Sequence, residues 1–514
     1  MRAGSAADGE GPGRSAGAAQ PPGAWPADLL RATAANTAAL FAAQVFNRFT
    51  AFLVATILTR YLGPERFGEY AFICAYVGFF ILVADMGIDI HVIREASRDL
   101  AGSADALGSA IGLKAWLALA AFGGALLVGW AVGIRGERLG LVAVSASGLL
   151  LAPLTLYGAA FFATLRLHLS AFLDALGRAL LVAFVVVVVL RKGSLIAVFV
   201  ALVLPGYAVA FLTVLWGRRL VRPRIGFFRG RAMRRILVRS LPIALGLMLT
   251  QIVMRIDQVM LEAMRGSREL GFYSVGVKCC EALNILPAIV TASLFPLLSR
   301  AAANPVEDLS RIYGSGLRTL ALALLPLVVV LSLYPAEILT TVFGPSYGYG
   351  ASALRILCWS AILFAVAHVA ASVAIALGRR GTLVLMTFCM ASANVGLNAV
   401  LIPRQDALGG GNGAAVATLL ALCSCLPILW LRPALRPVAR AFAAQSWRPA
   451  LAAAAALGCV AALRPPLAAG IALALVLYLA AVVLLGAVDR SDWHRVMRIV
   501  RAGGSDSDAG AKAL

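Results

Sequence analysis

The sequence has few charged residues, and acidic residues are the scarcer kind. Asp, Glu, Lys and Arg together make up 13% of the 514 residues, whereas an ordinary soluble protein has about a quarter. Apolar residues reach 61%, and the mean hydropathy is +0.89. These values exclude a single soluble domain and a disordered chain, and they argue against a nucleic-acid-binding protein despite the net charge of +21. They predict an integral membrane protein with many spans.

Residue types that carry metal and enzymatic chemistry are also scarce. The chain has only four histidines, and none has metal-ligand spacing with another. All eight cysteines fall in apolar segments, so we expect no disulfide, no metal site and no cofactor. No phosphate-binding G-x-x-x-x-G-K-[ST] motif is present. No segment between the apolar stretches is long enough for a catalytic domain. The protein is therefore not expected to be an enzyme.

The apolar stretches predict an all-α polytopic membrane protein. A helix needs about 20 residues to cross the hydrocarbon core, and on that rule the chain holds about fourteen spans. Their predicted bounds are 34–60, 67–90, 109–134, 139–163, 169–190, 194–216, 240–264, 271–297, 315–335, 349–377, 383–402, 411–431, 447–463 and 467–487.

Basic residues predict both the orientation and the division of the chain. With the N-terminus in the cytoplasm and these span bounds, 27 basic residues lie in the cytoplasmic segments and nine in the segments on the other side, as the positive-inside rule requires. Both termini are therefore expected in the cytoplasm. Residues 217–239, which we predict to link the two halves of the chain, hold nine arginines and no acidic residue. We interpret this linker as an anchor on anionic headgroups. The predicted domains are a disordered tail 1–33, an N-terminal lobe 34–216, a basic linker 217–239, a C-terminal lobe 240–431, a helix pair 432–487 and a tail 488–514.

A short motif recurs in the two predicted six-helix lobes. Gly63-Pro64-Glu65-Arg66-Phe67-Gly68-Glu69-Tyr70 follows the first span, and Gly266-Ser267-Arg268-Glu269-Leu270-Gly271-Phe272-Tyr273 follows the seventh. An offset of 203 residues superposes both glycines and the tyrosine. The repeat indicates two pseudo-symmetric lobes, an arrangement typical of transporters that rock about a central cavity.

Polar stripes on the first and seventh spans predict a binding cavity. A charged residue in mid-membrane costs about 2.5–3.5 kcal/mol on insertion, so it faces a partner or a wet cavity. Cations on the first helix of each lobe suggest an anion site, and phosphate suits Arg because the guanidinium binds it through two hydrogen bonds. The stripe residues that we predict to line the cavity are Gln44, Asn47, Arg48, Gln251, Arg255 and Gln258.

Other charges within the spans have several interpretations. Asp257 lies about 200° around the helix from Arg255 and should contact a different neighbour. Lys278 and Glu281 are spaced to pair with each other. We predict Lys278 and Arg355 as further cavity residues, and Asp257 and Glu281 as candidates for ion coupling. For each of these the alternative is an internal ion pair that fixes helix packing, and Arg355 could extend to the membrane interface.

Two further carboxylates, Asp85 and Asp89, lie one helical turn apart at the inner end of the second span. His91 and Arg94 follow them closely in the sequence. We interpret the two carboxylates as interfacial.

Four motifs in a fixed order resemble one known family. The motifs are the stretch 59–70, the segment Arg255-Ile256-Asp257-Gln258 with Gly271-Phe272-Tyr273 and Lys278, the turn Phe343-Gly344-Pro345-Ser346-Tyr347, and the unit of Asn394, Asn398 and Gly413-Ala414-Ala415-x-Ala417-Thr418. They are similar to motifs of the Wzx-type lipid-linked oligosaccharide flippases, which belong to the multidrug/oligosaccharidyl-lipid/polysaccharide (MOP) exporter superfamily. The resemblance covers about residues 34–431.

This resemblance implies a bacterial inner-membrane protein that moves an undecaprenyl-pyrophosphate-linked oligosaccharide outward by alternating access. Its expected partners are membrane lipids, the lipid-linked substrate, and glycosyltransferases and a polymerase of the same pathway, with no nucleic acid. Three alternatives stay open: a flippase for a peptidoglycan precursor, a cation-coupled multidrug exporter, and a non-transporting scaffold of a polysaccharide assembly complex.

Overall fold

The computed structural model describes residues 27–96, 104–164, 166–221, 223, 230–291, 294, 309–463 and 465–487. Helices dominate these residues, and no strand occurs among them. Of the predicted tail 1–33, residues 1–26 lie outside the described part of the chain, and residues 27–33 belong to helix α1, which begins at Ala27. The predicted tail 488–514 also lies outside it.

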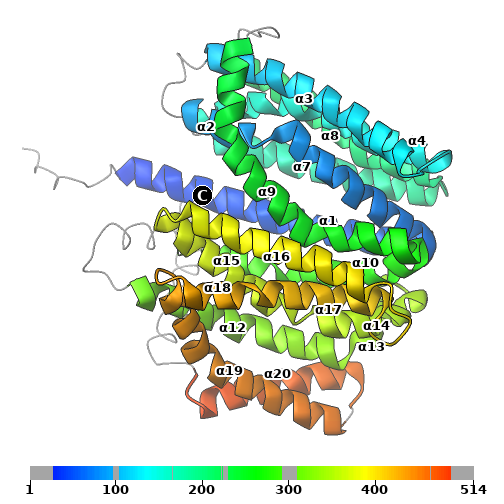
Figure 1. Cartoon of the computed structure of the whole chain (residues 1–514), viewed down its shortest axis with the longest axis vertical. Coiled ribbons are helices and arrows are strands. Elements are labelled where there is room, and N and C mark those ends of the chain that lie inside the picture. Colours follow the sequence, from blue (N-terminus) through cyan, green and yellow to red (C-terminus); the bar gives the residue numbers. More distant parts are fainter. Residues whose placement is uncertain are drawn as a thin grey trace, which may run out of the picture.

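The first lobe is built from the N-terminal helices. Figure 1 shows them, in blue to cyan, in its upper half, with the first part of α1 running along the second lobe. They are α1 (Ala27–Asp85), α2 (Ile88–Ala96), α3 (Ala104–Ala131), α4 (Glu137–Ser147), η1 (Gly148–Leu151), α5 (Ala152–Thr155), η2 (Leu156–Gly158), α6 (Ala159–Ala163), α7 (Leu167–Leu190) and α8 (Leu195–Leu220).

The second lobe and a C-terminal helix pair follow. In Figure 1 they occupy the lower half, in green to orange, except for α9, which begins at the top beside α2; the pair α19 and α20 lies at the bottom. The elements are α9 (Gly230–Arg265), α10 (Ser267–Leu283), α12 (Leu309–Leu333), α13 (Pro335–Phe343), η3 (Pro345–Gly350), α14 (Ala351–Leu357), α15 (Ser360–Ala376), α16 (Arg380–Leu401), α17 (Gly410–Cys423), α18 (Cys425–Leu431), α19 (Arg436–Leu463) and α20 (Leu467–Leu484).

The number of crossing helices agrees with the prediction of about fourteen spans. Twelve helices in the described residues are long and apolar enough to cross a membrane, or thirteen if the bent pair Pro345–Leu357 and Ser360–Ala376 is one span. One of the twelve, Gln44–Ile93, contains two helices on either side of a kink at Gly63. The bent pair corresponds to the tenth predicted span, which is broken by 44° rather than continuous.

The basic linker is partly helical. Helix α9 begins at Gly230, so the last part of the segment predicted as linker continues into the seventh span. Its first turns pack on the first lobe, where Met233 and Ile236 share a buried cluster with Ile88 and Val92 of α2. Helix α9 therefore joins the two lobes, and Figure 1 shows it running from beside α2 to beside α10.

The repeated motif forms the same turn in both lobes. Gly63 has φ 69° and ψ 174°, and Gly266 has φ 85° and ψ 172°. A side chain would strain this backbone, since φ is positive, so glycine is the residue that fits. Each glycine ends one helix and begins the next. We call the end of the molecule that holds these two turns the turn end, and the opposite end, where α8 stops and α9 starts, the linker end.

The two repeats pack directly against each other at the turn end. A Cβ atom added to Gly68 would overlap the carbonyl oxygen of Ser267, and one added to Gly271 would overlap that of Pro64. These contacts are related by the same offset of 203 residues. Close backbone approach through small residues is a common way for membrane helices to associate. In Figure 1 the lobes meet at the right, beside α10, and separate towards α2 at the left.

The C-terminal pair attaches to the second lobe through α12. A Cβ on Gly314 of α12 would lie 3.7 Å from the Ala441 side chain of α19. Further along, the Tyr334 hydroxyl after α12 donates a hydrogen bond of 2.9 Å to the Pro465 carbonyl after α19. Helices α12 and α19 therefore run side by side in the same direction.

Candidate functional site

Three of the predicted residues form an ion-paired group, which we call the second-lobe triad. Arg255 of α9 lies 2.7 Å from one carboxylate oxygen of Glu281, and Lys278 of α10 lies 2.8 Å from the other. Their side chains are 28%, 25% and 26% exposed in the order Arg255, Lys278, Glu281. The triad carries one net positive charge, and all three of its side chains are partly exposed.

The first helix adds a further cation to this region. Arg48 of α1 is exposed, and its charge acts on Glu281. Asn47 is half-buried, and its side-chain oxygen is buried with no hydrogen-bond partner, while Gln44 is exposed. Together with the second-lobe triad, Arg48 makes three cations against one carboxylate between α1, α9 and α10.

The second half of α1 also lies close to Arg255. Tyr70 and Cys74 lie one helical turn apart, and their side chains form a hydrogen bond with each other. Both also interact electrostatically with the guanidinium of Arg255. The Cys74 side chain is exposed. Sequence reasoning missed both residues, although Tyr70 closes the first repeat and is the counterpart of Tyr273.

The polar stripe on α9 continues in both directions from Arg255. Gln251 contacts α1, since a Cβ on Gly78 would lie 2.8 Å from the Gln251 side-chain nitrogen. Gln258 is buried, and its side-chain nitrogen has no partner. The stripe thus runs from a contact with the first lobe, past the triad, towards the turn end.

At the turn end, Arg138 connects the lobes in a group that we call the turn-end clamp. Its guanidinium lies 3.0 Å from Glu69 of the first lobe and 3.1 Å from Glu262 of the second. It also donates a hydrogen bond of 2.9 Å to Ser267. Sequence reasoning missed this clamp, although Glu69 and Ser267 both belong to the repeated motif.

Asp257 belongs to a different, fully buried network. Its side chain is 3% exposed and accepts a hydrogen bond from the Tyr273 hydroxyl. It accepts another, of 2.8 Å, from the backbone N–H of Gln258. Tyr273 also bonds to Thr418. Asp257 and Arg255 therefore have different partners, as their positions around the helix predict.

The network extends through two more helices of the second lobe. Asn394 donates to Thr418 at 3.4 Å, and Asn398 donates to Asn394 at 3.0 Å. Both asparagines are fully buried, and the Asn398 side-chain oxygen has no partner. The motif containing these residues was visible in the sequence, but its proximity to Asp257 was not. Across the described residues, no group of three or more His, Cys, Asp or Glu side chains could hold a metal ion.

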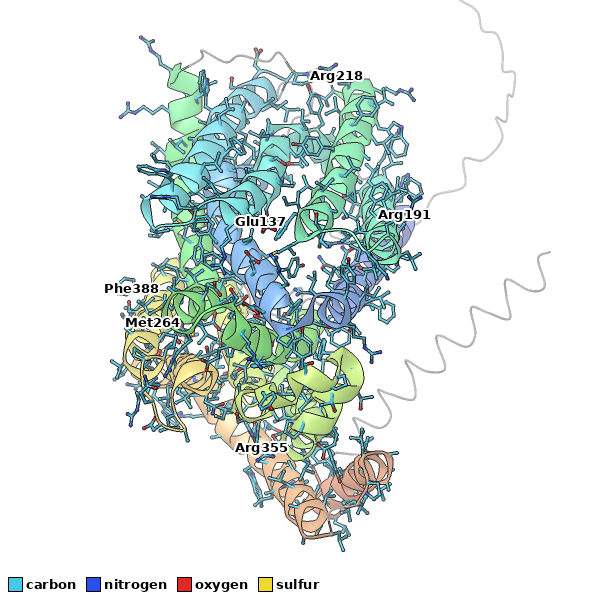
Figure 2. The ribbon with its side chains drawn as sticks, turned by 90° about the vertical axis from the view of Figure 1, so that its right-hand side faces the viewer. Glu137, Arg191, Arg218, Met264, Arg355 and Phe388 are labelled. Atoms are coloured by element: carbon cyan, nitrogen blue, oxygen red, sulfur yellow. The ribbon has the colours of Figure 1, made fainter. Side chains whose placement is uncertain are left out.

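Arg355 is the predicted cavity residue that the structure does not bring to the triad. Its Nε donates to the carbonyl of Ser332 in α12, at 3.1 Å. Figure 2, which views the turn end, shows Arg355 low in the second lobe near α19, away from Glu137 at the first lobe.

The interpretation of Asp85 and Asp89 as simply interfacial is incomplete. Both carboxylates lie 2.7 Å from the Nζ of Lys114, whose side chain is 2% exposed. We call these residues the first-lobe triad. The lysine was not singled out from the sequence, although a lone cation in the apolar helix α3 is the signal that could have found it.

Comparisons with known proteins identify a sequence family and a fold. The family described as "Polysaccharide biosynthesis protein" matches residues 33–302. No curated protein matches the chain by sequence. Among solved structures, "Lipid II flippase MurJ, inward closed conformation" superposes with a TM-score of 0.67 at 11% identity, covering 86% of this chain and 97% of that one.

Two transporters of another group share the architecture. An inward-facing MATE-family multidrug transporter of the MOP superfamily has a TM-score of 0.58 at 16% identity, covering 77% of this chain and 96% of that one. A mutant of the Vibrio cholerae MATE transporter VcmN has a TM-score of 0.54 at 14% identity, with 79% of this chain and 100% of that one covered. At these identities the likeness concerns the fold.

Proposed function

Because the chain belongs to the polysaccharide biosynthesis protein family, we propose that it is a flippase for an undecaprenyl-pyrophosphate-linked oligosaccharide. It acts in the bacterial inner membrane by alternating access, with both termini in the cytoplasm, and it is not an enzyme. The observation that carries the proposal is the group of three cations and one carboxylate, partly open to solvent, between α1, α9 and α10.

Arg48 and Arg255 are the proposed ligands of the substrate pyrophosphate, with Lys278 beside them. Arg255 and Lys278 share Glu281, which neutralises part of their charge while no phosphate is bound. An arriving pyrophosphate competes with Glu281 for these cations. The free-energy cost of this exchange is small because one set of charge-assisted hydrogen bonds replaces another. The glycan then occupies the space between the lobes.

Alternating access requires the turn end to open after the substrate is bound. The contacts to be broken are the close approach of Gly68 and Gly271 and the turn-end clamp of Arg138. The Arg138 side chain is 47% exposed, whereas Glu69 and Glu262 are 9% and 7% exposed. Water must therefore reach both carboxylates as the lobes separate, because a carboxylate left buried without its partner is costly. The turn end is thus closed by a close fit of backbone and by ion pairs that break only when their carboxylates become hydrated.

We propose the membrane potential as the driving force, with Asp257 as a further candidate site for ion coupling. Each charge that crosses the membrane gains about 2.3 kcal/mol per 100 mV, and outward movement of a pyrophosphate follows that field. The Asp257 network offers one carboxylate with hydroxyl and amide oxygens from Thr418, Asn394 and Asn398. These are oxygen ligands that suit a small hard cation or accommodate a proton.

Two of the alternatives have an observation in their favour. The structural likeness to a lipid II flippase favours a peptidoglycan precursor as cargo, and the likeness to multidrug transporters, with a buried Asp257, favours a cation-coupled exporter. The family match favours the oligosaccharide. The lipid-linked saccharide that accumulates when the gene is deleted distinguishes the three.

Flipping in vesicles tests the mechanism directly. With an imposed potential and no ion gradient, the wild-type protein should translocate the lipid-linked oligosaccharide. The Arg48→Ala/Arg255→Ala variant should lose this activity, whereas Arg48→Lys/Arg255→Lys should retain part of it because the charge remains. Full activity in the alanine variant would refute the pyrophosphate site, and transport that ignores the potential would refute the driving force.

A further inference from the structure

A polar cavity at the linker end lies outside the transport site described above. Its volume is about 280 Å³. Arg318 of α12, Gln445, Trp447 and Arg448 of α19, and Gly486 after α20 line it. Among the described lining residues there is no carboxylate.

The cavity lies where three helices change from polar to apolar. Arg318 is the last charged residue of α12, and Arg448 is the last charged residue of α19. These two helices are parallel neighbours, so both change character at the same level. The apolar helix α20 ends at Leu484, next to the cavity. A boundary of this kind marks the depth of lipid headgroups.

The side chains around the cavity are held in place. Arg448 donates a hydrogen bond of 2.9 Å to the Gly486 carbonyl, and its guanidinium lies 5.2 Å from the centre of the Trp447 ring. Trp447 is 50% exposed, as is typical of an aromatic side chain at a membrane interface. The Ser446 hydroxyl next to it is buried and has no partner. Fixed donors of this kind lose little freedom when a ligand binds.

We propose that this cavity, lined by Arg318 and Arg448, binds the phosphate group of an anionic membrane lipid, whose charge no headgroup cation neutralises. A phosphate accepts paired hydrogen bonds from guanidinium groups, and basic cavities between membrane helices suit anionic headgroups. The lipid would join α12 of the second lobe to the C-terminal pair α19 and α20. Two sources carry this chemistry, an anionic phospholipid and a polyprenyl phosphate. Neither requires the protein to be a flippase.

Lipid binding to the full-length protein in detergent tests the proposal, with bound lipids counted by native mass spectrometry. The probes are phosphatidylglycerol, phosphatidylcholine with the same acyl chains, and undecaprenyl phosphate. Arg318→Gln/Arg448→Gln should bind the preferred phosphate lipid more weakly, by about fivefold for each arginine if each contributes about 1 kcal/mol. Arg379→Gln/Arg380→Gln is the matched control, since it removes two exposed charges at the linker end. Lipid binding to this control should stay close to that of the wild-type protein.

The outcomes separate the two lipid sources from a failed proposal. A preference for phosphatidylglycerol identifies a phospholipid site, and a preference for undecaprenyl phosphate identifies a polyprenyl site. Equal binding of phosphatidylcholine, or an equal loss in the control variant, overturns the proposal. Because Arg448 also bonds to Gly486, its replacement could unfold the C-terminal pair. Arg318→Gln alone preserves that bond and should still weaken binding about fivefold.

Discussion

The two lobes each contain a triad of charged side chains, and the two triads are opposite in composition. In the first lobe, Lys114 sits between two carboxylates at 2.7 Å each. In the second lobe, Glu281 sits between two cations at 2.7 and 2.8 Å. The central lysine is 2% exposed, whereas the central glutamate is 26% exposed. The outer carboxylates of the first-lobe triad are 26% and 39% exposed, so the difference between the triads lies in the burial of the central side chain.

This difference in exposure separates structural charges from charges available to a ligand. A buried cation has no access to water and depends on its carboxylate partners, so the first-lobe triad locks α1, α2 and α3 together. A partly exposed triad can exchange partners, since water and incoming ions compensate each charge during the exchange. Short ion pairs within a membrane protein therefore do not reveal their role until their exposure is known.

The largest expected effect comes from removing the buried lysine. Lys114→Met leaves two carboxylates without their cation. Because these carboxylates are 26% and 39% exposed, the loss of unfolding free energy should be about 2–3 kcal/mol, below the value of about 3–5 kcal/mol for a fully buried pair. Lys278→Met is the matched variant, because Glu281 keeps Arg255, and it should cost about 1 kcal/mol or less. Thermal unfolding of both purified variants measures the difference. Equal destabilisation would remove the distinction between the triads.

The turn-end clamp offers a third setting, in which charges meet only while the lobes touch. Gly68→Ala places a methyl group against the Ser267 carbonyl and should weaken closure of the turn end by about 1–3 kcal/mol, the usual cost of overpacking. Gly246→Ala is the control, since a Cβ there meets nothing within 4 Å. Distances between spin labels on the two lobes should lengthen at the turn end in Gly68→Ala only. Unchanged distances would show that this contact does not hold the lobes closed.

A smaller effect is expected when the central carboxylate of the second-lobe triad is neutralised. Glu281→Gln releases Arg255 and Lys278 from their partner, so undecaprenyl pyrophosphate should bind about tenfold more tightly, which corresponds to about 1.4 kcal/mol. Binding to the purified variant by calorimetry measures this change. If affinity is unchanged while transport loses its dependence on an ion gradient, Glu281 serves ion coupling and does not compete with phosphate.

The smallest expected effect is that of salt on the two triads, measured as a change in ligand binding at one triad and a change in protein stability at the other. Raising the ionic strength from about 0.1 to about 1 M shortens the screening length from about 10 to about 3 Å. Pyrophosphate binding at the exposed second-lobe triad should weaken about threefold as its charges are screened. The stability of the wild-type protein should change little with salt, since Lys114 is 2% exposed. Lys114→Met should gain stability as salt screens the repulsion between Asp85 and Asp89, which are 26% and 39% exposed. A variant whose stability does not respond to salt would contradict repulsion between these two carboxylates.

Much of the architecture follows from the sequence because it depends on local properties. Apolar length set the number of spans, and the offset of 203 residues between Gly63 and Gly266 indicated two equivalent lobes. The same turn geometry at both glycines follows from their freedom to adopt positive φ. Periodicity also placed Arg255 and Asp257 on different sides of α9, where the structure gives them different partners.

The partners of the charged residues were decided by tertiary packing. Lys114 meets Asp85 and Asp89 because α3 packs on α1 and α2, and Asp257 lies in one network with Thr418 because α17 packs on α9 and α10. These residues are far apart in the chain, and no local pattern encodes which helices become neighbours. Sequence determined which residues must avoid lipid, since an unpaired charge there is costly. The fold determined which of those residues are buried with a partner and which remain partly exposed.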